Sequence, residues 1–177
     1  MRHTLLALTI ALAIAGCAKS PRTAVATPTL AAMDNAELLA RGEYLVRIGG
    51  CNDCHTAGYA EQQGNIDRAQ WLTGSPLGYR GPWGTTYAAN LRLKLAGMDE
   101  AQWLAYSANL HTRPLMPDFA LRAMREDDRR ALYRFVRSLG PAGVPAPAYT
   151  PPGQQPAPPY LDLVLPPVVA AGPPKAG

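Results

Sequence analysis

Cys51-Asn52-Asp53-Cys54-His55 is the stretch on which the interpretation of this 177-residue sequence depends. Its spacing, C-x-x-C-H, is the one that attaches haem covalently: two thiols add across the two vinyl groups of the ring, and the histidine that follows ligates the iron. The sequence therefore predicts one covalent haem c, attached to Cys51 and Cys54, with His55 as the proximal iron ligand.

Two other interpretations of the paired cysteines stay open. A C-x-x-C pair also occurs in thioredoxin-like redox proteins and as half of a zinc site. A redox pair normally follows a strand, whereas the residues before Cys51 have a helical pattern. A tetrahedral zinc site needs four ligands, and the other cysteine and histidines of the chain are Cys17, His3 and His111. Haem attachment is the interpretation that the sequence favours.

The N-terminal residues 1–16 have the pattern of a secretory signal peptide, with a short basic start and an apolar run over residues 5–15. That run is shorter than the ~20 residues of a membrane-spanning helix. Ile14-Ala15-Gly16-Cys17 resembles a bacterial lipobox, which implies cleavage before Cys17 and lipidation of its thiol; an ordinary signal peptide with a chance cysteine is the alternative. We expect a lipid-anchored protein of the bacterial cell envelope that faces the periplasm, and Ala18 slightly favours the outer membrane.

Composition divides the rest of the chain into three parts. Residues 17–33 are rich in alanine, threonine and proline and are expected to form a tether. Residues 34–140 carry the periodic patterns of a folded domain, and residues 141–177, which hold 12 of the 18 prolines, are expected to form an irregular tail. The net charge is +4, but acidic and basic residues nearly balance within residues 34–140, so no partner nucleic acid is expected.

Three helices are predicted within this domain, over residues 35–48, 99–107 and 125–139. The first follows Asp34, a favourable N-cap, and ends at Gly49-Gly50. The last runs from an acidic first turn to a basic end, the order that the helix dipole favours. The glycine-rich residues 56–97 lack such a pattern, and an irregular stretch of this length is expected only where it wraps a cofactor. We therefore expect an all-α fold of about three main helices and long loops around one haem.

These patterns over residues 34–140 resemble the class I c-type cytochromes. In that family an N-terminal helix leads into C-x-x-C-H and crosses a C-terminal helix near a small residue, for which Gly42 is the candidate. The stretches Tyr44-Leu45-Val46 and Gly84-Thr85-Thr86-Tyr87-Ala88-Ala89-Asn90-Leu91 resemble more narrowly the cytochrome modules of bacterial alcohol and sugar dehydrogenases. Those subunits often carry three haems, whereas this chain has one C-x-x-C-H, which implies a single module.

The resemblance also implies further site residues. The distal iron ligand of the family is a methionine on a loop before the last helix, and Met116 in Arg113-Pro114-Leu115-Met116-Pro117 matches that position. A thioether is a soft ligand that favours Fe(II). The alternative ligands in the chain are His111, Met124 and Met98. Side chains that bind the haem propionates come from the middle loop of the family, where this chain offers Arg80, Trp83, Tyr87 and Asn90; the alternative for the aromatic ones is that they only wall the haem.

The predicted function is that of a lipid-anchored monohaem electron carrier, which passes single electrons between redox partner proteins through His/Met-ligated iron. No catalytic residues are expected, because the scattered serines and acids form no recognisable triad. A second hypothesis is the cytochrome subunit of a membrane-associated dehydrogenase complex, with a quinoprotein or flavoprotein as its partner. A third is a haem catalyst or sensor with an open iron site, which requires a missing or displaceable sixth ligand.

Overall fold

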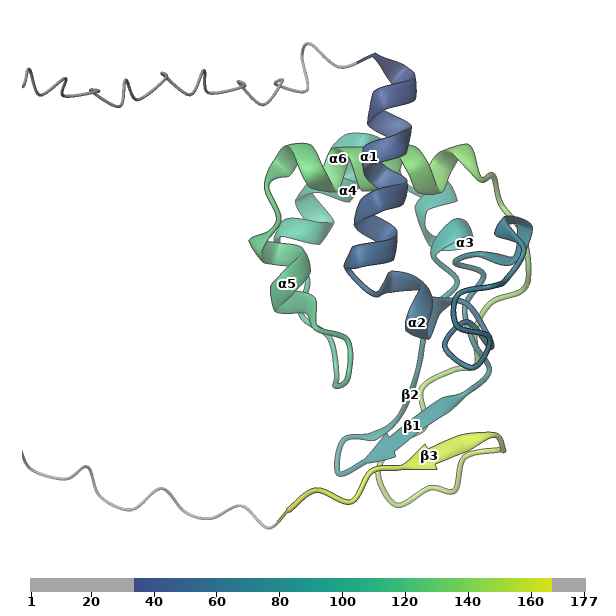
Figure 1. The fold of residues 1–177 in the computed structure, drawn as a ribbon. Helices are drawn as coiled ribbons and strands as arrows, with labels where there is room; N and C mark the ends of the chain where they lie inside the picture. Colours follow the sequence, from purple (N-terminus) through teal and green to yellow (C-terminus); the bar gives the residue numbers. More distant parts are fainter. Residues whose placement is uncertain (1–33, 167–177) are drawn as a thin grey trace, which may run out of the picture.

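The computed structural model describes residues 34–166, which include the predicted domain and most of the proline-rich tail (Figure 1). The predicted signal peptide, Cys17 with its lipid, and the tether lie outside the described residues, as do residues 167–177. The helices are α1 (Asn35–Ile48), α2 (Cys51–His55), α3 (Leu91–Ala96), α4 (Glu100–Ala108), α5 (Asp118–Ala123) and α6 (Glu126–Ser138). The strands are β1 (Gly78–Gly81), β2 (Gly84–Tyr87) and β3 (Tyr160–Asp162).

The three predicted helices are confirmed as α1, α4 and α6, with ends that differ by no more than one residue. Local sequence explains where they begin, because α1 and α4 each start with a capping box. The Asp34 carboxylate accepts the Glu37 backbone N–H at 2.8 Å, and the Glu37 carboxylate accepts the Asp34 N–H at 3.0 Å. Asp99 and Gln102 repeat the exchange at the start of α4, at 2.8 and 2.9 Å.

The crossing of α1 over α6 is the centre of the helical part (Figure 1). Gly42 lies at the contact, and a Cβ atom there would collide with the Ala131 carbonyl and come within 2.5 Å of the Phe135 Cβ. Glycine therefore allows the two backbones to approach closely, which explains its presence within a helix that it otherwise weakens by about 1 kcal/mol. Val46 and Phe135 on either side of the crossing are fully buried.

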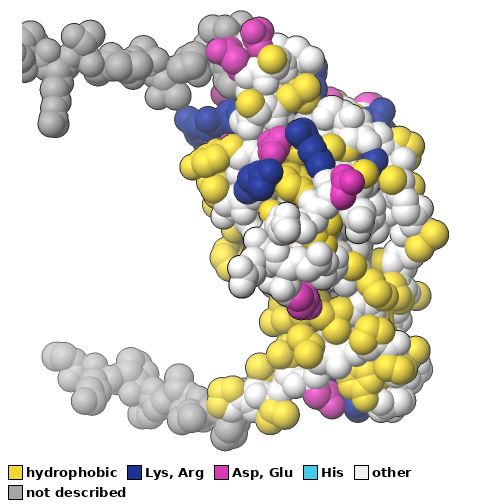
Figure 2. Space-filling model, turned by 45° about the vertical axis from the view of Figure 1, so that its right-hand side comes forward, with side chains coloured by type: hydrophobic (Ala, Val, Ile, Leu, Met, Phe, Trp, Pro, Cys, Tyr) yellow, Lys and Arg dark blue, Asp and Glu magenta, His cyan; other side chains and the backbone are white. Residues whose placement is uncertain are grey.

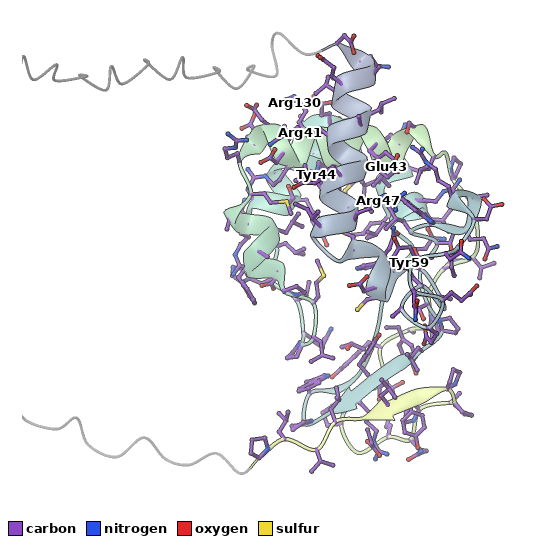
Figure 3. All side chains as sticks on the ribbon, in the orientation of Figure 1. Arg41, Glu43, Tyr44, Arg47, Tyr59 and Arg130 are labelled. Atoms are coloured by element: carbon purple, nitrogen blue, oxygen red, sulfur yellow. The ribbon has the colours of Figure 1, made fainter. Side chains whose placement is uncertain are left out.

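Charged side chains of α1 extend this packing at the surface. Figure 3 labels Glu43 and Arg47 among them, and also Tyr59 of the middle loop. Arg47 pairs with the Glu43 carboxylate at 2.9 Å, and its guanidinium lies 4.4 Å from the centroid of the Trp71 ring. Trp71 is buried and meets Tyr59 and Phe135 edge-on, with ring centroids 5.9 and 6.4 Å apart. The middle loop is thereby joined to the two crossing helices.

The expectation of an all-α fold is wrong, because the described residues also form a three-stranded mixed sheet in the order β2-β1-β3. β1 and β2 are antiparallel, with Gly78 opposite Tyr87 and Gly81 opposite Gly84, and β3 lies parallel to β1. Each strand has three or four residues, and β1 and β2 contain glycine instead of an alternating apolar pattern. Nothing in the local sequence therefore indicates a strand.

The proline-rich segment 141–166, here named the C-terminal strap, is more ordered than expected. Its residues 160–162 form β3, and the Leu163 N–H continues the pairing by donating to the Arg80 carbonyl at 2.9 Å. Earlier in the strap, Thr150 and Thr85 exchange two backbone hydrogen bonds, at 2.8 and 3.1 Å. The strap thus returns along both sides of the β1–β2 hairpin, as Figure 1 shows.

The elements form two layers. A helical layer contains α1 and α3–α6, and a sheet layer contains β1–β3 with the C-terminal strap; α2 projects from the end of α1 toward the sheet layer (Figure 1). Figure 2 shows hydrophobic side chains gathered over the sheet layer on one face, with most charged side chains on the helical layer. None of the helices between residues 34 and 166 has the length and apolar character needed to cross a membrane.

Candidate cofactor site

A cavity of about 380 Å³ lies between the helical layer and the sheet layer. Its size is within the range of ~300–1,000 Å³ that small-molecule and cofactor sites occupy. The walls come from α2, α3, α4, the hairpin strands, the segment between α4 and α6, and the C-terminal strap. Most of the lining is apolar, as expected of a cofactor site with few polar anchoring groups.

One wall of the cavity is made by α2, which follows the end of α1 after Gly49 and Gly50. Cys51, Cys54 and His55 all line the cavity. Residues three and four apart lie on the same face of a helix, so this single turn presents both thiols and the imidazole to one space. Neither cysteine is in a disulfide; Cys51 is partly buried and Cys54 is exposed.

The His55 ring is fixed by a hydrogen bond from one of its two nitrogens. Its Nδ1 lies 2.7 Å from the Ala89 carbonyl oxygen, which only accepts hydrogen bonds, so Nδ1 carries the proton and donates it. The lone pair is then on Nε2. Burial lowers the pKa of His55, partly offset by the bond to Ala89, which favours the neutral imidazole. A neutral ring fixed by a backbone carbonyl is the usual form of a histidine that ligates iron.

The Cys51 thiol differs from the thiols of a reactive redox pair. Burial raises the pKa of Cys51 to about 11, so this thiol stays protonated at neutral pH, whereas redox-active C-x-x-C pairs have a depressed pKa. The Tyr79 hydroxyl of β1 donates toward the Cys54 Sγ at 3.8 Å. Burial first, and then Cys54, raises the pKa of Tyr79 to about 12. Tyr79 is a cavity residue that the sequence did not single out.

Met116 lines the same cavity as the C-x-x-C-H turn, from the segment between α4 and α5. It is 38% exposed, which places it at the edge of the cavity. Of the alternative ligands, Met124 also lines the cavity, whereas Met98 and His111 do not. The structure thus brings together two thiols, one imidazole and two thioethers, and leaves out two of the four distal candidates.

Of the four predicted propionate-binding residues, only Tyr87 lines the cavity. Arg80 pairs instead with Asp162 of β3 at 3.4 Å, and its guanidinium lies 5.8 Å from the centroid of the Tyr160 ring. Its side chain therefore joins β1 to the C-terminal strap.

Trp83 and Asn90 do not line the cavity either, and their side chains form hydrogen bonds with other parts of the chain. The Trp83 Nε1–H donates to the Tyr79 carbonyl at 3.3 Å. The Asn90 side chain caps α3 by accepting the Leu93 N–H at 3.0 Å, and its amide donates to the Ala142 carbonyl at 2.8 Å. Asn90 thus fixes the start of the C-terminal strap.

Two basic residues that were not predicted lie on the cavity wall, Lys94 of α3 and Arg113 near Met116. The Lys94 Nζ is 4.7 Å from the centroid of the Tyr106 ring, and the Arg113 guanidinium is 3.7 Å from that of Tyr149. No local signal distinguishes them from other surface cations, because their place on the wall depends on how distant segments meet.

Comparisons of the chain with protein-family models, with curated proteins and with solved structures found no match. Over residues 34–166, no group of three or more histidine, cysteine, aspartate or glutamate side chains is arranged to hold a metal ion.

The donor set of the cavity fits a covalently bound haem. Two thiols and a neutral imidazole share one helical turn, thioethers reach the same space, and the walls are mostly apolar around two basic groups. A flat apolar ring that carries two vinyl groups and two carboxylates, and whose iron takes axial nitrogen and sulfur ligands, matches these groups in chemistry.

Proposed function

We propose that the protein is a monohaem c-type cytochrome that transfers single electrons. Cys51 and Cys54 would attach the haem, each S–H adding across a vinyl C=C so that no atom is lost, and His55 and Met116 would ligate the iron. The bound group would supply the one-electron Fe(III)/Fe(II) couple. The observation that carries the proposal is the presence of the C-x-x-C-H turn and Met116 on one mostly apolar cavity.

In this proposal, residues of the chain have three roles toward the haem: they orient the iron ligand, exclude water and bind the carboxylates. The Ala89 carbonyl keeps Nε2 of His55 free for the iron. The apolar walls exclude water, which favours a raised reduction potential together with the thioether ligand. Lys94 and Tyr87 are the wall groups suited to the haem carboxylates, since the Arg113 guanidinium is already stacked on the Tyr149 ring. In this proposal Lys94 replaces Arg80, Trp83 and Asn90 as a group that binds the carboxylates.

The cellular setting remains a proposal that rests on the N-terminal sequence. Lipidation of Cys17 would anchor the protein in the bacterial envelope, with the domain facing the periplasm. A role as the cytochrome subunit of a dehydrogenase complex, beside a quinoprotein or flavoprotein, is the second candidate. It is favoured by exposed apolar side chains on the strap, since Val164 is 93% and Leu165 is 53% exposed, and such residues often mark protein interfaces.

Haem attachment is tested by producing the protein in a host that matures c-type cytochromes, and by measuring its visible spectrum and intact mass. We expect one haem per chain that acidified organic solvent does not extract. Cys51→Ser and Cys54→Ser each remove one thioether, whereas the matched control Cys17→Ser keeps the haem and loses the lipid. A colourless wild-type protein with the mass of its amino acids alone contradicts the proposal.

Iron ligation is tested by the ferric spectrum of methionine variants. Met116→Ala is expected to remove the charge-transfer band of methionine-ligated iron and to produce high-spin ferric haem. Met124→Ala changes the cavity wall but keeps the band, and Met98→Ala is the control outside the cavity. If Met124→Ala removes the band and Met116→Ala does not, the assignment of the sixth ligand is wrong. High-spin iron in the wild-type protein instead supports an open-site catalyst or sensor.

A further inference from the structure

We infer that the C-terminal strap holds the Met116 segment in place, and that Tyr149 of the strap is a positioning residue for the sixth iron ligand. The inference rests on the proposed function, because it concerns the same cavity. It assigns a role to the proline-rich segment, for which the sequence indicated only an irregular tail.

The strap is fixed to β2 at the point where Tyr149 lies. The Thr85 N–H donates to the Thr150 carbonyl at 2.8 Å, and the Thr150 N–H donates back at 3.1 Å. The Tyr149 hydroxyl donates to the Trp83 carbonyl at 2.8 Å. Gly84 has a φ of +92°, and a Cβ there would collide with the Thr150 carbonyl, so the hairpin turn is shaped to receive the strap. Tyr149 is therefore held through the backbone of its neighbour Thr150 and through its own hydroxyl.

The Tyr149 ring in turn contacts the segment that carries Met116. The Arg113 guanidinium lies 3.7 Å from the ring centroid, a distance typical of a close cation–π contact, and Arg113 precedes Met116 by three positions. A second contact comes from β2, where the Thr86 hydroxyl donates to the Pro114 carbonyl at 2.8 Å. Both contacts connect the methionine segment to the sheet layer.

The hydrogen bonds of the segment with the helical layer are made to α5, the helix that follows it directly in the chain. The Asp118 N–H donates to the Met116 carbonyl at 2.9 Å, the Asp118 carboxylate accepts the Thr112 N–H at 2.5 Å, and the Arg122 guanidinium donates to the Leu110 carbonyl. Such bonds shape a turn but do not fix its distance from α2, across the cavity. The sheet layer and its strap therefore determine whether Met116 stays at the cavity.

Loss of the Tyr149 ring should let the Met116 segment leave the cavity more often, which opens the sixth position to other ligands. The probe is imidazole, which binds ferric haem where methionine is displaced, without any redox change. For Tyr149→Leu we expect imidazole to bind ~10-fold more tightly, from the loss of one well-formed cation–π contact, and the methionine–iron band to weaken. Tyr149→Phe keeps the ring but loses the bond to the Trp83 carbonyl, so we expect a smaller effect than that of Tyr149→Leu.

Two further variants separate this role from a general loss of stability. Tyr160→Leu is the matched control, since it removes another strap tyrosine whose ring meets Arg80 instead, and we expect unchanged imidazole affinity. Arg113→Leu alters an exposed side chain and leaves the strap intact, so it should fold and reproduce the effect of Tyr149→Leu. Combining it with Tyr149→Leu should add little, because both remove the same contact.

Hydrogen exchange provides a readout that does not depend on ligand binding. Amides of residues 112–117 should exchange faster in Tyr149→Leu than in Tyr160→Leu, with α1 and α6 unchanged. A wild-type protein that carries methionine-ligated haem, together with Tyr149→Leu and Arg113→Leu variants of unchanged spectrum and imidazole affinity, overturns this inference and leaves the proposed function standing. Absence of haem from the wild-type protein refutes the proposed function instead.

Discussion

The helical layer and the sheet layer are stabilised by different kinds of contact. The helical layer has a buried apolar core that includes Val46, Leu132, Phe135 and Val136. None of the buried hydrophobic side chains described for the chain belongs to β1, β2 or β3. The sheet layer consists of short strands joined by backbone hydrogen bonds and covered by the C-terminal strap.

This difference indicates that the two layers depend on the cavity to different degrees. A buried apolar core stabilises the helices whether or not a cofactor is bound. The sheet layer buries little apolar surface of its own, so the contents of the cavity would supply much of its core. Four experiments can test this contrast, beginning with the one that should have the largest effect.

The crossing of α1 and α6 should be the most sensitive point of the molecule. Gly42→Ala places a Cβ against the Ala131 carbonyl and Phe135, and we expect the free energy of unfolding to fall by about 3 kcal/mol. Urea unfolding followed by far-ultraviolet circular dichroism measures this. Gly97→Ala is the control, because its nearest neighbour would be at 3.6 Å, and it should shift stability by less than ~0.5 kcal/mol. Equal effects of the two variants would falsify the importance of the crossing.

The pH dependence of stability that arises from the Cys51 thiol shows whether water reaches the helical side of the cavity in the haem-free protein. Its pKa rises from 9.0 to about 11 on burial, so the folded state holds this proton more tightly than the unfolded chain. The resulting stability is present below about pH 9 and is lost as the pH rises toward 11, with a total of about 3 kcal/mol.

The measurement compares unfolding of haem-free wild-type protein and Cys51→Ser across this pH range. The serine variant lacks the ionisable group, so subtracting its curve removes the contribution of tyrosines and lysines. Parallel curves for the two proteins mean that water reaches the Cys51 sulfur.

A substitution in the turn between β1 and β2 should destabilise the sheet layer alone. Gly84→Ala forces a residue with a side chain to adopt a φ of +92° and pushes on the Thr150 carbonyl, at a cost of about 1–2 kcal/mol. We expect protease cleavage within the strap to become faster while the helical circular dichroism signal persists. Loss of the helical signal at the same protease or urea concentration means that the two layers unfold as one unit.

The smallest expected effect is the difference in stability lost when an ion pair is removed from the sheet layer or from the helical layer. Arg80→Ala removes the pair with Asp162, whose side chain is 60% exposed, and should cost less than ~0.5 kcal/mol. Arg41→Ala removes the pair with Asp128, which is only 12% exposed, and should cost more. The thermal unfolding midpoints of the two variants show which one loses more stability. A larger loss in Arg80→Ala than in Arg41→Ala contradicts the proposed difference between the layers.

Sequence reasoning succeeded where the determinants of structure are local. Asp34 with Glu37 and Asp99 with Gln102 are contiguous capping signals, and the helices that they begin were predicted almost to the residue. The C-x-x-C-H turn is also local, and the structure places it on a cavity together with Met116.

The missed features depend on segments that are far apart in the sequence. β3 meets β1 through residues 82 positions apart, such as Arg80 and Asp162, and neither strand has a pattern of its own. The same dependence on distant segments explains why sequence reasoning named Arg80 but not Arg113 and Lys94, the cations that line the cavity. Which side chains share a cavity is decided by tertiary packing, which composition and spacing do not encode.

The place of the strap at the end of the chain has a consequence for biosynthesis. A polypeptide emerges amino end first, so α1 to α6 are complete before residues 141–166 have been made. Until then the space in front of Cys51 and Cys54 lacks one of its walls, and under the proposed function a bulky porphyrin could reach both thiols there. Adding the strap last would close the site over a bound group, so the order in which the exported chain emerges and folds would place attachment before closure.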